Sequence, residues 1–192
     1  MSHRFNPENR HRLLSAERHE MMPPDRILGW LPVRPDMTIA DIGCGPGFFT
    51  LPLAERLPQG TVLALDVEPV MLQTVEERAA AAGLANIRTL LAGEDALPIE
   101  PSSLDGAFLS MVYHEIPTRQ HYLEHLRSLV KPGGWLAIAE WEKRPNPGGG
   151  PPLANRLTPA ETRADMLAAG WPVTAQETIN EWMYFLLSQP GQ

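Results

Sequence analysis

The chain has 192 residues, of which 43% are hydrophobic and 20% charged, and its net charge is −7. This size and balance suit one globular domain, and the acidic surplus argues against a nucleic-acid partner, because such proteins usually carry a basic face. The one cysteine excludes an internal disulfide and a thiolate metal cluster and favours a cytoplasmic protein. No apolar run reaches the ~20 residues that a membrane span needs, so we expect none.

The first 34 residues predict a helical segment ahead of the main domain. Residues 7–21 are polar and helix-forming, and Pro23-Pro24-Asp25 opens a short helix that runs to Leu31. We expect residues 1–34 to form an N-terminal helical lid segment and residues 35–192 the main domain. Basic residues interleaved with acids are typical of a solvated helix face; a lid over the active site and a polyanion-binding arm are the alternatives. The basic residues are Arg4, Arg10, Arg12, Arg18 and Arg26.

Strands and helices then alternate along the chain. This order predicts a parallel sheet with right-handed crossovers, in which ligands bind at the carboxyl ends of the strands. The expected strands are 37–42, 61–66, 86–91, 104–111, 135–140, 172–178 and 181–187, and the expected helices are 47–57, 69–82, 118–130 and 159–169. Residues 144–152 are rich in proline and glycine and predict a flexible loop.

A glycine-rich turn follows the first of these strands. Gly43, Gly45 and Gly47 stand at every second position, which permits a bend with positive φ and leaves room for a ligand beside the backbone. The spacing differs from the Gly-x-Gly-x-x-Gly of dinucleotide sites. Asp41, two residues before the turn, would repel a diphosphate but can accept a hydrogen bond from an ammonium group. A nucleoside that carries an amino acid, such as S-adenosylmethionine, fits these features.

A second acidic residue stands at the end of the next strand. Asp66 lies 19 positions after Gly47. In nucleotide-binding βαβ units, an acid about 20 residues past the glycine turn accepts hydrogen bonds from the ribose hydroxyls. Asp66 therefore predicts a ribose-binding carboxylate and selects against a 2′-phosphate.

These motifs identify a family resemblance that extends from Met37 to Trp141. The chain resembles the class I S-adenosylmethionine-dependent methyltransferases, in particular small bacterial ones similar to ubiquinone/menaquinone-biosynthesis C-methyltransferases. Four sequence blocks, in order, carry it: residues 41–47, 65–72, 94–98 and 129–136. The resemblance implies a Rossmann-like three-layer α/β sandwich, with a mostly parallel seven-stranded sheet whose last strand is antiparallel.

The resemblance also implies a set of cofactor contacts. The three glycines would line the methionine end of S-adenosylmethionine, Asp41 would hold its amine, and Asp66 would bind the ribose. Val67 would pack on one face of the adenine, Asp95 would accept from its exocyclic amine, and the backbone N–H of Ala96 would donate to the ring. Met111, at the end of the fourth strand, is expected beside them.

Catalytic residues are harder to identify, because methyl transfer needs mainly alignment of the two reactants. The best candidates are His114, as a general base, and Glu115, which would orient it or bind the substrate. Both could instead cap the loop. Glu140, at the end of the fifth strand, could also face the substrate or simply end a strand. His121 and His125 lack a nearby acid in register, so no metal site is expected.

The leading hypothesis is an S-adenosylmethionine-dependent methyltransferase that acts on a small-molecule acceptor. An NAD-linked oxidoreductase and a non-catalytic S-adenosylmethionine-binding module are the alternatives. The acceptor, its reacting atom and the oligomeric state are open at this stage.

Overall fold

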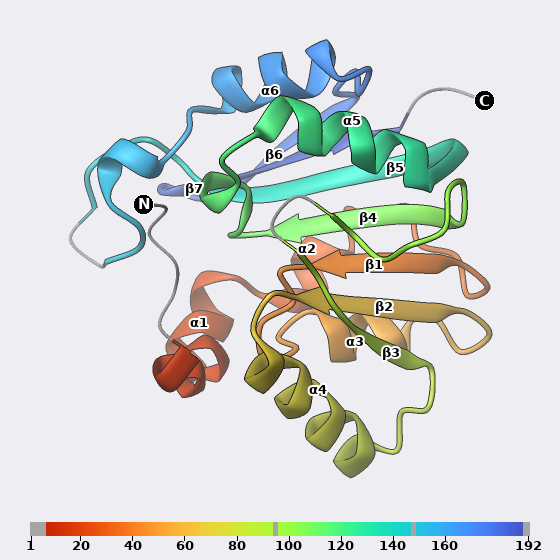
Figure 1. The fold of residues 1–192 in the computed structure, drawn as a ribbon. Coiled ribbons are helices and arrows are strands. Elements are labelled where there is room, and N and C mark those ends of the chain that lie inside the picture. The colour runs from red at the N-terminus through yellow and green to blue at the C-terminus, as the bar shows by residue number, and fades with distance from the viewer. Residues whose placement is uncertain (1–6, 94–95, 147–148, 190–192) are drawn as a thin grey trace.

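Seven strands form one sheet in the computed structural model, which describes residues 7–93, 96–146 and 149–189 (Figure 1). The strand order is β3-β2-β1-β4-β5-β7-β6; the first five strands are parallel, and β7 is antiparallel to both of its neighbours. The strands are β1 (Thr38–Ile42), β2 (Thr61–Asp66), β3 (Ile87–Leu91), β4 (Leu104–Ser110), β5 (Val130–Trp141), β6 (Ala175–Asn180) and β7 (Met183–Ser188). The expected sheet, with its antiparallel last strand, is confirmed.

Helices cover both faces of this sheet. They are α1 (Ala16–Met21), α2 (Pro24–Leu28), α3 (Thr50–Glu55), α4 (Pro69–Ala82), α5 (Arg119–Leu129) and α6 (Pro159–Ala168), with 3₁₀ turns at Pro7–Leu14, Tyr113–Glu115 and Leu153–Asn155. Alternate residues of a strand point to opposite faces. In β1, Ala40 and Ile42 pack in one core cluster with α5 and α6, whereas Ile39 packs in the other with α2 and α3. The molecule is therefore the expected three-layer sandwich.

The interior strands are buried on both faces, as their continuous apolar runs predict. Every residue of β4 from Gly106 to Ser110 is buried. Gly106 is required by close packing, because a Cβ atom there would lie 2.1 Å from the ring of Trp135 on β5. The chain between β3 and β4 contains no helix in its described parts, so β3 leads to β4 through an irregular segment.

Several element boundaries differ from the expected ones. The helix expected over 47–57 is confined to α3, because Gly47 has φ +84° and cannot belong to a right-handed helix. The segment 7–21 divides at Ser15, whose extended backbone (φ −68°, ψ 156°) caps α1. β6 begins three residues later than expected. β7 begins two residues later, because the chain turns at residues 181–182.

Residues before β1 take part in two different environments. Met22, Ile27 and Leu28 are at most 1% exposed and belong to the same core cluster as the sheet. None of the α1 residues is buried. Residues 10–21 therefore contain no buried residue, in contrast to the segment that follows them.

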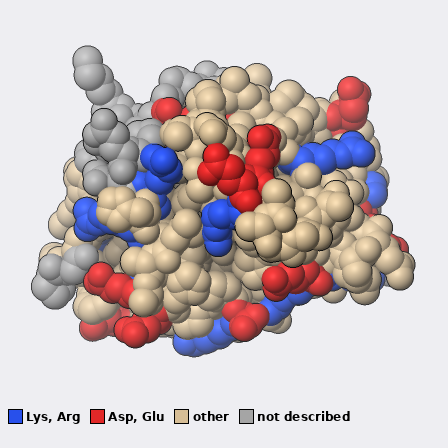
Figure 2. Space-filling model, turned by 90° about the horizontal axis from the view of Figure 1, so that it is seen from below, with Lys and Arg blue, Asp and Glu red and all other residues tan. Residues whose placement is uncertain are grey.

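The surface carries charges of both signs. On the face shown in Figure 2, Lys and Arg side chains are interspersed with Asp and Glu, and the described residues on that face form no continuous basic area. None of the helices in the described part of the chain has the length and apolar character of a bilayer-crossing segment.

Candidate active site

A pocket of about 700 Å³ opens at the carboxyl ends of β1, β2 and β4. This is the place where ligands bind in open α/β sheets, next to the point at which the strand order reverses. Its wall on the other side comes from α1 and the preceding turn, and from the loop after β5. Residues from these segments that line it include Arg12, Leu13, Arg18, Met21, Gly150 and Pro151.

The glycine turn forms the floor of this pocket. All three glycines have positive φ: +67° at Gly43, +52° at Gly45 and +84° at Gly47. Gly43 and Gly45 line the pocket, and a Cβ atom on Gly43 would lie 2.6 Å from the side chain of Val112. Gly47 does not line the pocket, since a Cβ atom there would face Leu51. Gly47 shapes the bend from outside the pocket.

Asp41 lies in the pocket with its carboxylate almost fully buried. The residue is 2% exposed, and Oδ2 accepts a hydrogen bond of 2.6 Å from the hydroxyl of Thr50. Among the described residues, no cation lies within ion-pair distance of Asp41. Burial raises its pKa to about 7, and the neighbouring Asp66 adds to this effect while Thr50 opposes it. A buried carboxylate without a cation favours a positively charged ligand group, and the ammonium of S-adenosylmethionine is such a group.

Asp66 ends β2 and is fixed by backbone donors. Its Oδ2 accepts from the N–H of Gly45 at 2.8 Å, and its Oδ1 accepts from the N–H of Glu68 at 2.9 Å. Burial raises the pKa of this carboxyl group, while these backbone donors oppose the rise. Each carboxylate oxygen has room for a second hydrogen bond, so Asp66 can also accept from ligand hydroxyls. Val67 lines the pocket next to it.

Of the two residues expected to contact the adenine, the structure describes one. Asp95 lies outside the described residues. Ala96 is exposed and does not line the pocket; its backbone C=O accepts from the N–H of Gly93, which does line it.

The end of β4 places two more side chains in the pocket. Met111 has φ +58°, a left-handed conformation that is uncommon for a residue with a side chain and concentrates at functional sites. Its N–H donates to the C=O of Ala139, which holds the strained residue in place. The Oγ atom of Ser110 is buried without a hydrogen-bond partner and lies in the same wall, so it is available to a ligand.

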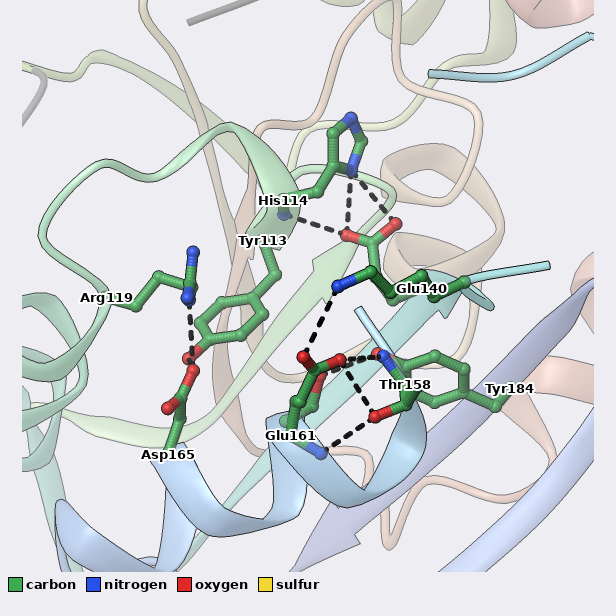
Figure 3. A network of polar contacts seen from close by, with 10 residues as sticks. Tyr113, His114, Arg119, Glu140, Thr158, Glu161, Asp165 and Tyr184 are labelled. Atoms are coloured by element: carbon green, nitrogen blue, oxygen red, sulfur yellow. Dashed lines mark hydrogen bonds and ion pairs between the residues drawn. The ribbon is translucent and has the colours of Figure 1, made fainter. Parts of the chain in front are cut away.

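His114 and Glu140 form a buried pair beside the pocket (Figure 3). The Nδ1 atom of His114 lies 3.0 Å from both carboxylate oxygens of Glu140, and its backbone N–H also donates to Oε2. Burial acts to lower the pKa of His114, but the carboxylates of Glu140 and Glu115 outweigh it and raise the pKa above its ordinary value. This geometry places the proton on Nδ1 and leaves Nε2 as the basic atom.

Sequence reasoning assigns the orienting role to Glu115, but the structure places Glu140 there. The Oε1 atom of Glu115 lies 3.8 Å from Nε2 of His114, on the pocket side. The signal for Glu140 is its place at the end of β5, because β4 and β5 are adjacent and parallel and their ends meet. Glu140 is 0% exposed, which matches a positioning role better than substrate contact.

Arg156 fastens the loop that roofs this region. Its guanidinium donates to the C=O groups of Arg144, Gly149 and Pro151 and to Oδ1 of Asn146, at 2.8–3.1 Å. It also stacks on the ring of Trp141 at 5.0 Å. The proline- and glycine-rich composition indicates a flexible loop, and one buried arginine holds the described part of it over the pocket.

The sequence also raised the questions of a metal site and of a reactive cysteine. No group of three or more His, Cys, Asp or Glu residues able to hold a metal ion occurs in the described part of the chain. Cys44 is buried in the glycine turn, and burial raises the pKa of its thiol well above the usual range, which suits a small structural residue and not a nucleophile.

Comparisons with known proteins agree with this geometry. A family model described as a methyltransferase domain matches residues 39–134, half of the chain. A trans-aconitate 2-methyltransferase from Methylobacterium nodulans is 30% identical over an alignment 173 residues long, and the match covers 83% of this chain and 65% of that protein. A ubiquinone/menaquinone biosynthesis C-methyltransferase from a Ruegeria species is 28% identical and matches 65% of this chain and 50% of its own length.

Among solved structures, a SAM-dependent methyltransferase from Aquifex aeolicus superposes with a TM-score of 0.90 and 26% identity. The match covers 96% of this chain and 98% of that one. The chain therefore belongs to the class I S-adenosylmethionine-dependent methyltransferases, a family whose cofactor is S-adenosylmethionine. It spans between 46% and 65% of the length of the first curated relatives that it matches.

Proposed function

We propose that this protein transfers the methyl group of S-adenosylmethionine to a small-molecule acceptor bound in the pocket. The observation that carries the proposal is the convergence of Asp41, Gly45 and Asp66 at one edge of the sheet, in a pocket of about 700 Å³. Pockets of this size are typical of cofactor and substrate sites. The names of the relatives, which refer to aconitate and to quinones, support a small acceptor.

The residues present fit the cofactor. Asp41 is a buried carboxylate whose charge lacks a described cation, Asp66 has free acceptor capacity, and Gly45 lines the pocket with bare backbone where a side chain would intrude. S-adenosylmethionine supplies the activated methyl group when bound. The expected roles of Gly43, Val67, Asp95, Ala96 and Met111 remain part of this proposal.

The chain's own residues would then orient the acceptor and remove a proton. His114 accepts that proton at Nε2, while Glu140 holds the opposite nitrogen and stabilises the imidazolium that forms. Trp141 and Pro151 line the acceptor side of the pocket and would exclude water from it. We place the small-molecule acceptor between these residues and α1, and we assign no nucleic-acid partner.

The experiment is a calorimetric titration of the purified protein with S-adenosylhomocysteine and, separately, with NAD. We expect binding of S-adenosylhomocysteine and none of NAD. The reverse result would identify an NAD-linked protein and overturn the proposal. A methyl-transfer screen with small acids, phenols and quinols follows, and binding without transfer to any acceptor would favour a non-catalytic module.

A further inference from the structure

The pocket contains a guanidinium that none of the roles above uses. Arg18 lies on α1 and lines the pocket opposite the strand ends. Its Cζ atom stacks 5.0 Å from the centroid of the Phe48 ring, and Phe48 directly follows the glycine turn. This contact holds the guanidinium on the side of the pocket where the glycine turn lies.

This guanidinium has no acceptor in the described structure. The Nε atom of Arg18 is buried and has no hydrogen-bond partner, and no carboxylate oxygen of the described residues lies within ion-pair distance. Burial lowers its pKa to about 10, so it is still protonated at neutral pH. Other arginines that are at least partly buried are satisfied: Arg78 donates to the C=O of Pro46, and Arg119 donates to Asp165. A desolvated charge without a partner costs free energy unless a ligand supplies one.

The other charged residues that line the pocket indicate where a negatively charged ligand group could bind. Carboxylates outnumber guanidinium groups among the residues that line it, so an anionic group is disfavoured over most of its surface. The lining carboxylates are Glu17, Asp41, Asp66, Glu68 and Glu115, and the lining guanidinium groups are Arg12 and Arg18. Arg12 is exposed and its charge is screened by water, whereas Arg18 is half-buried with its Nε atom shielded from solvent, so an anion would bind more strongly at Arg18. The planar guanidinium fork matches a carboxylate, which it can bind with two parallel hydrogen bonds.

We propose that Arg18, on the N-terminal side of the pocket, is a binding residue for a ligand carboxylate. The carboxylate belongs either to the amino-acid end of the cofactor or to the acceptor. This inference rests on the proposed function for the identity of the pocket, but not for the chemistry of the group that Arg18 binds.

The test uses the variants Arg18→Met and Arg18→Lys, with Arg88→Met as the control, because Arg88 is exposed on β3 and does not line the pocket. Each protein is titrated calorimetrically with S-adenosylhomocysteine and with its decarboxylated analogue. Each protein, with and without saturating S-adenosylhomocysteine, is also titrated with acetate, succinate, citrate and trans-aconitate.

If Arg18 holds the cofactor carboxylate, Arg18→Met weakens binding of S-adenosylhomocysteine at least tenfold and leaves binding of the analogue unchanged. If it holds an acceptor carboxylate, the affinity for S-adenosylhomocysteine is unchanged and binding of the free carboxylates is lost. Arg18→Lys keeps the positive charge but lacks the planar guanidinium, so its affinity for the carboxylate ligand is expected between those of the wild type and Arg18→Met. Arg88→Met matches the wild type throughout.

Unchanged affinities for every probe in Arg18→Met would overturn the inference. A melting temperature of the ligand-free Arg18→Met protein well below that of the control, together with unchanged affinities, would assign Arg18 to the fold instead. Failure of the wild-type protein to bind S-adenosylhomocysteine contradicts the proposed function, and the free-carboxylate titrations still decide the role of Arg18.

Discussion

At the scale of single residues, the proposed general-base role depends on the buried pair of His114 and Glu140. An imidazole would be neutral for much of the time at neutral pH, and burial alone would favour that form. Glu140 opposes this tendency, because its carboxylate contacts Nδ1 directly, and together with Glu115 it raises the pKa of His114 above its ordinary value. The pair therefore has a measurable signature that does not require knowledge of the acceptor.

We expect Glu140→Gln to lower the pKa of His114, since the variant removes the charge but keeps an oxygen that accepts from Nδ1. Titration of the histidine ring protons by NMR, with the His114 signals assigned from their loss in His114→Asn, measures this shift. Glu177→Gln is the matched control, because Glu177 is exposed on β6. A pKa of His114 that does not move in Glu140→Gln would remove Glu140 from the proposed role.

Once an acceptor is identified, His114→Asn is expected to lower kcat by about 100-fold, in line with the loss of a general base. The affinity for S-adenosylhomocysteine should stay within about twofold of the wild type, because the Asp41 and Asp66 contacts are untouched. Steady-state kinetics and calorimetry measure the two quantities. Turnover at the wild-type rate would exclude His114 from the reaction.

At the scale of elements, a glycine can be needed because the backbone has positive φ or because a ligand lies beside it, and two glycines of this chain allow these reasons to be compared. Gly45 and Gly83 both have left-handed backbone conformations, with φ +52° and +69°. Gly45 lines the pocket, whereas Gly83 ends α4, and a Cβ atom added to Gly83 would have no other atom within 4 Å. A side chain at either position would destabilise the fold to a similar extent, because both have positive φ. The positions differ in their surroundings, since only Gly45 lies at the pocket.

We expect Gly45→Ala and Gly83→Ala to lose similar stability, about 1–2 kcal/mol each, in urea unfolding. Only Gly45→Ala should weaken the binding of S-adenosylhomocysteine, by at least about tenfold, because the added methyl group occupies ligand space. Calorimetry on both variants gives the comparison. Equal affinities in the two variants would show that the turn does not contact the cofactor.

The order and type of the elements could be predicted from the sequence, because apolar runs and turn residues mark them. The expected bounds of β2 and α4 coincide with the observed ones, since Asp66 and Gly83 are clear ends. β5 begins earlier than expected: Val130 pairs with Leu104 before the Lys-Pro-Gly-Gly bulge, and such pairing depends on a distant strand. The partner of His114 escapes prediction for the same reason, since Glu115 is near in sequence but Glu140 is near in space. Arg18 gives no signal of its own among the arginines of the N-terminal segment.

At the scale of the whole molecule, buried acidic groups gather at one edge of the sheet and make stability depend on pH. Burial raises the pKa of Asp41 from 3.8 to about 7. Between these values the folded chain retains a proton that the unfolded chain has lost. Because the folded state then binds more protons, the free energy of unfolding falls as the pH rises from about 4 to about 7, and this contribution is constant above that range.

We expect Asp41→Asn to abolish this contribution. The difference in unfolding free energy between the variant and the wild type should grow in favour of the variant from pH 4 to pH 8, by an amount on the order of a few kcal/mol. Urea unfolding at pH 4, 6 and 8 measures it, with Asp36→Asn as an exposed control. A difference independent of pH would show that Asp41 is already ionised in the folded chain at low pH.

The hydrogen bonds that Arg156 makes to the loop after β5 bear on which residues of this protein can be substituted. Three of the four hydrogen-bond acceptors of Arg156 are main-chain oxygens. These three hydrogen bonds do not depend on the identity of the side chains in the loop. If the pocket binds the proposed acceptor, substitutions at exposed positions of this segment would change the acceptor side of the pocket. The residues on β1 and β2 that would hold the cofactor would stay unchanged. The proposed function therefore predicts that acceptor selectivity can change without a change in cofactor binding.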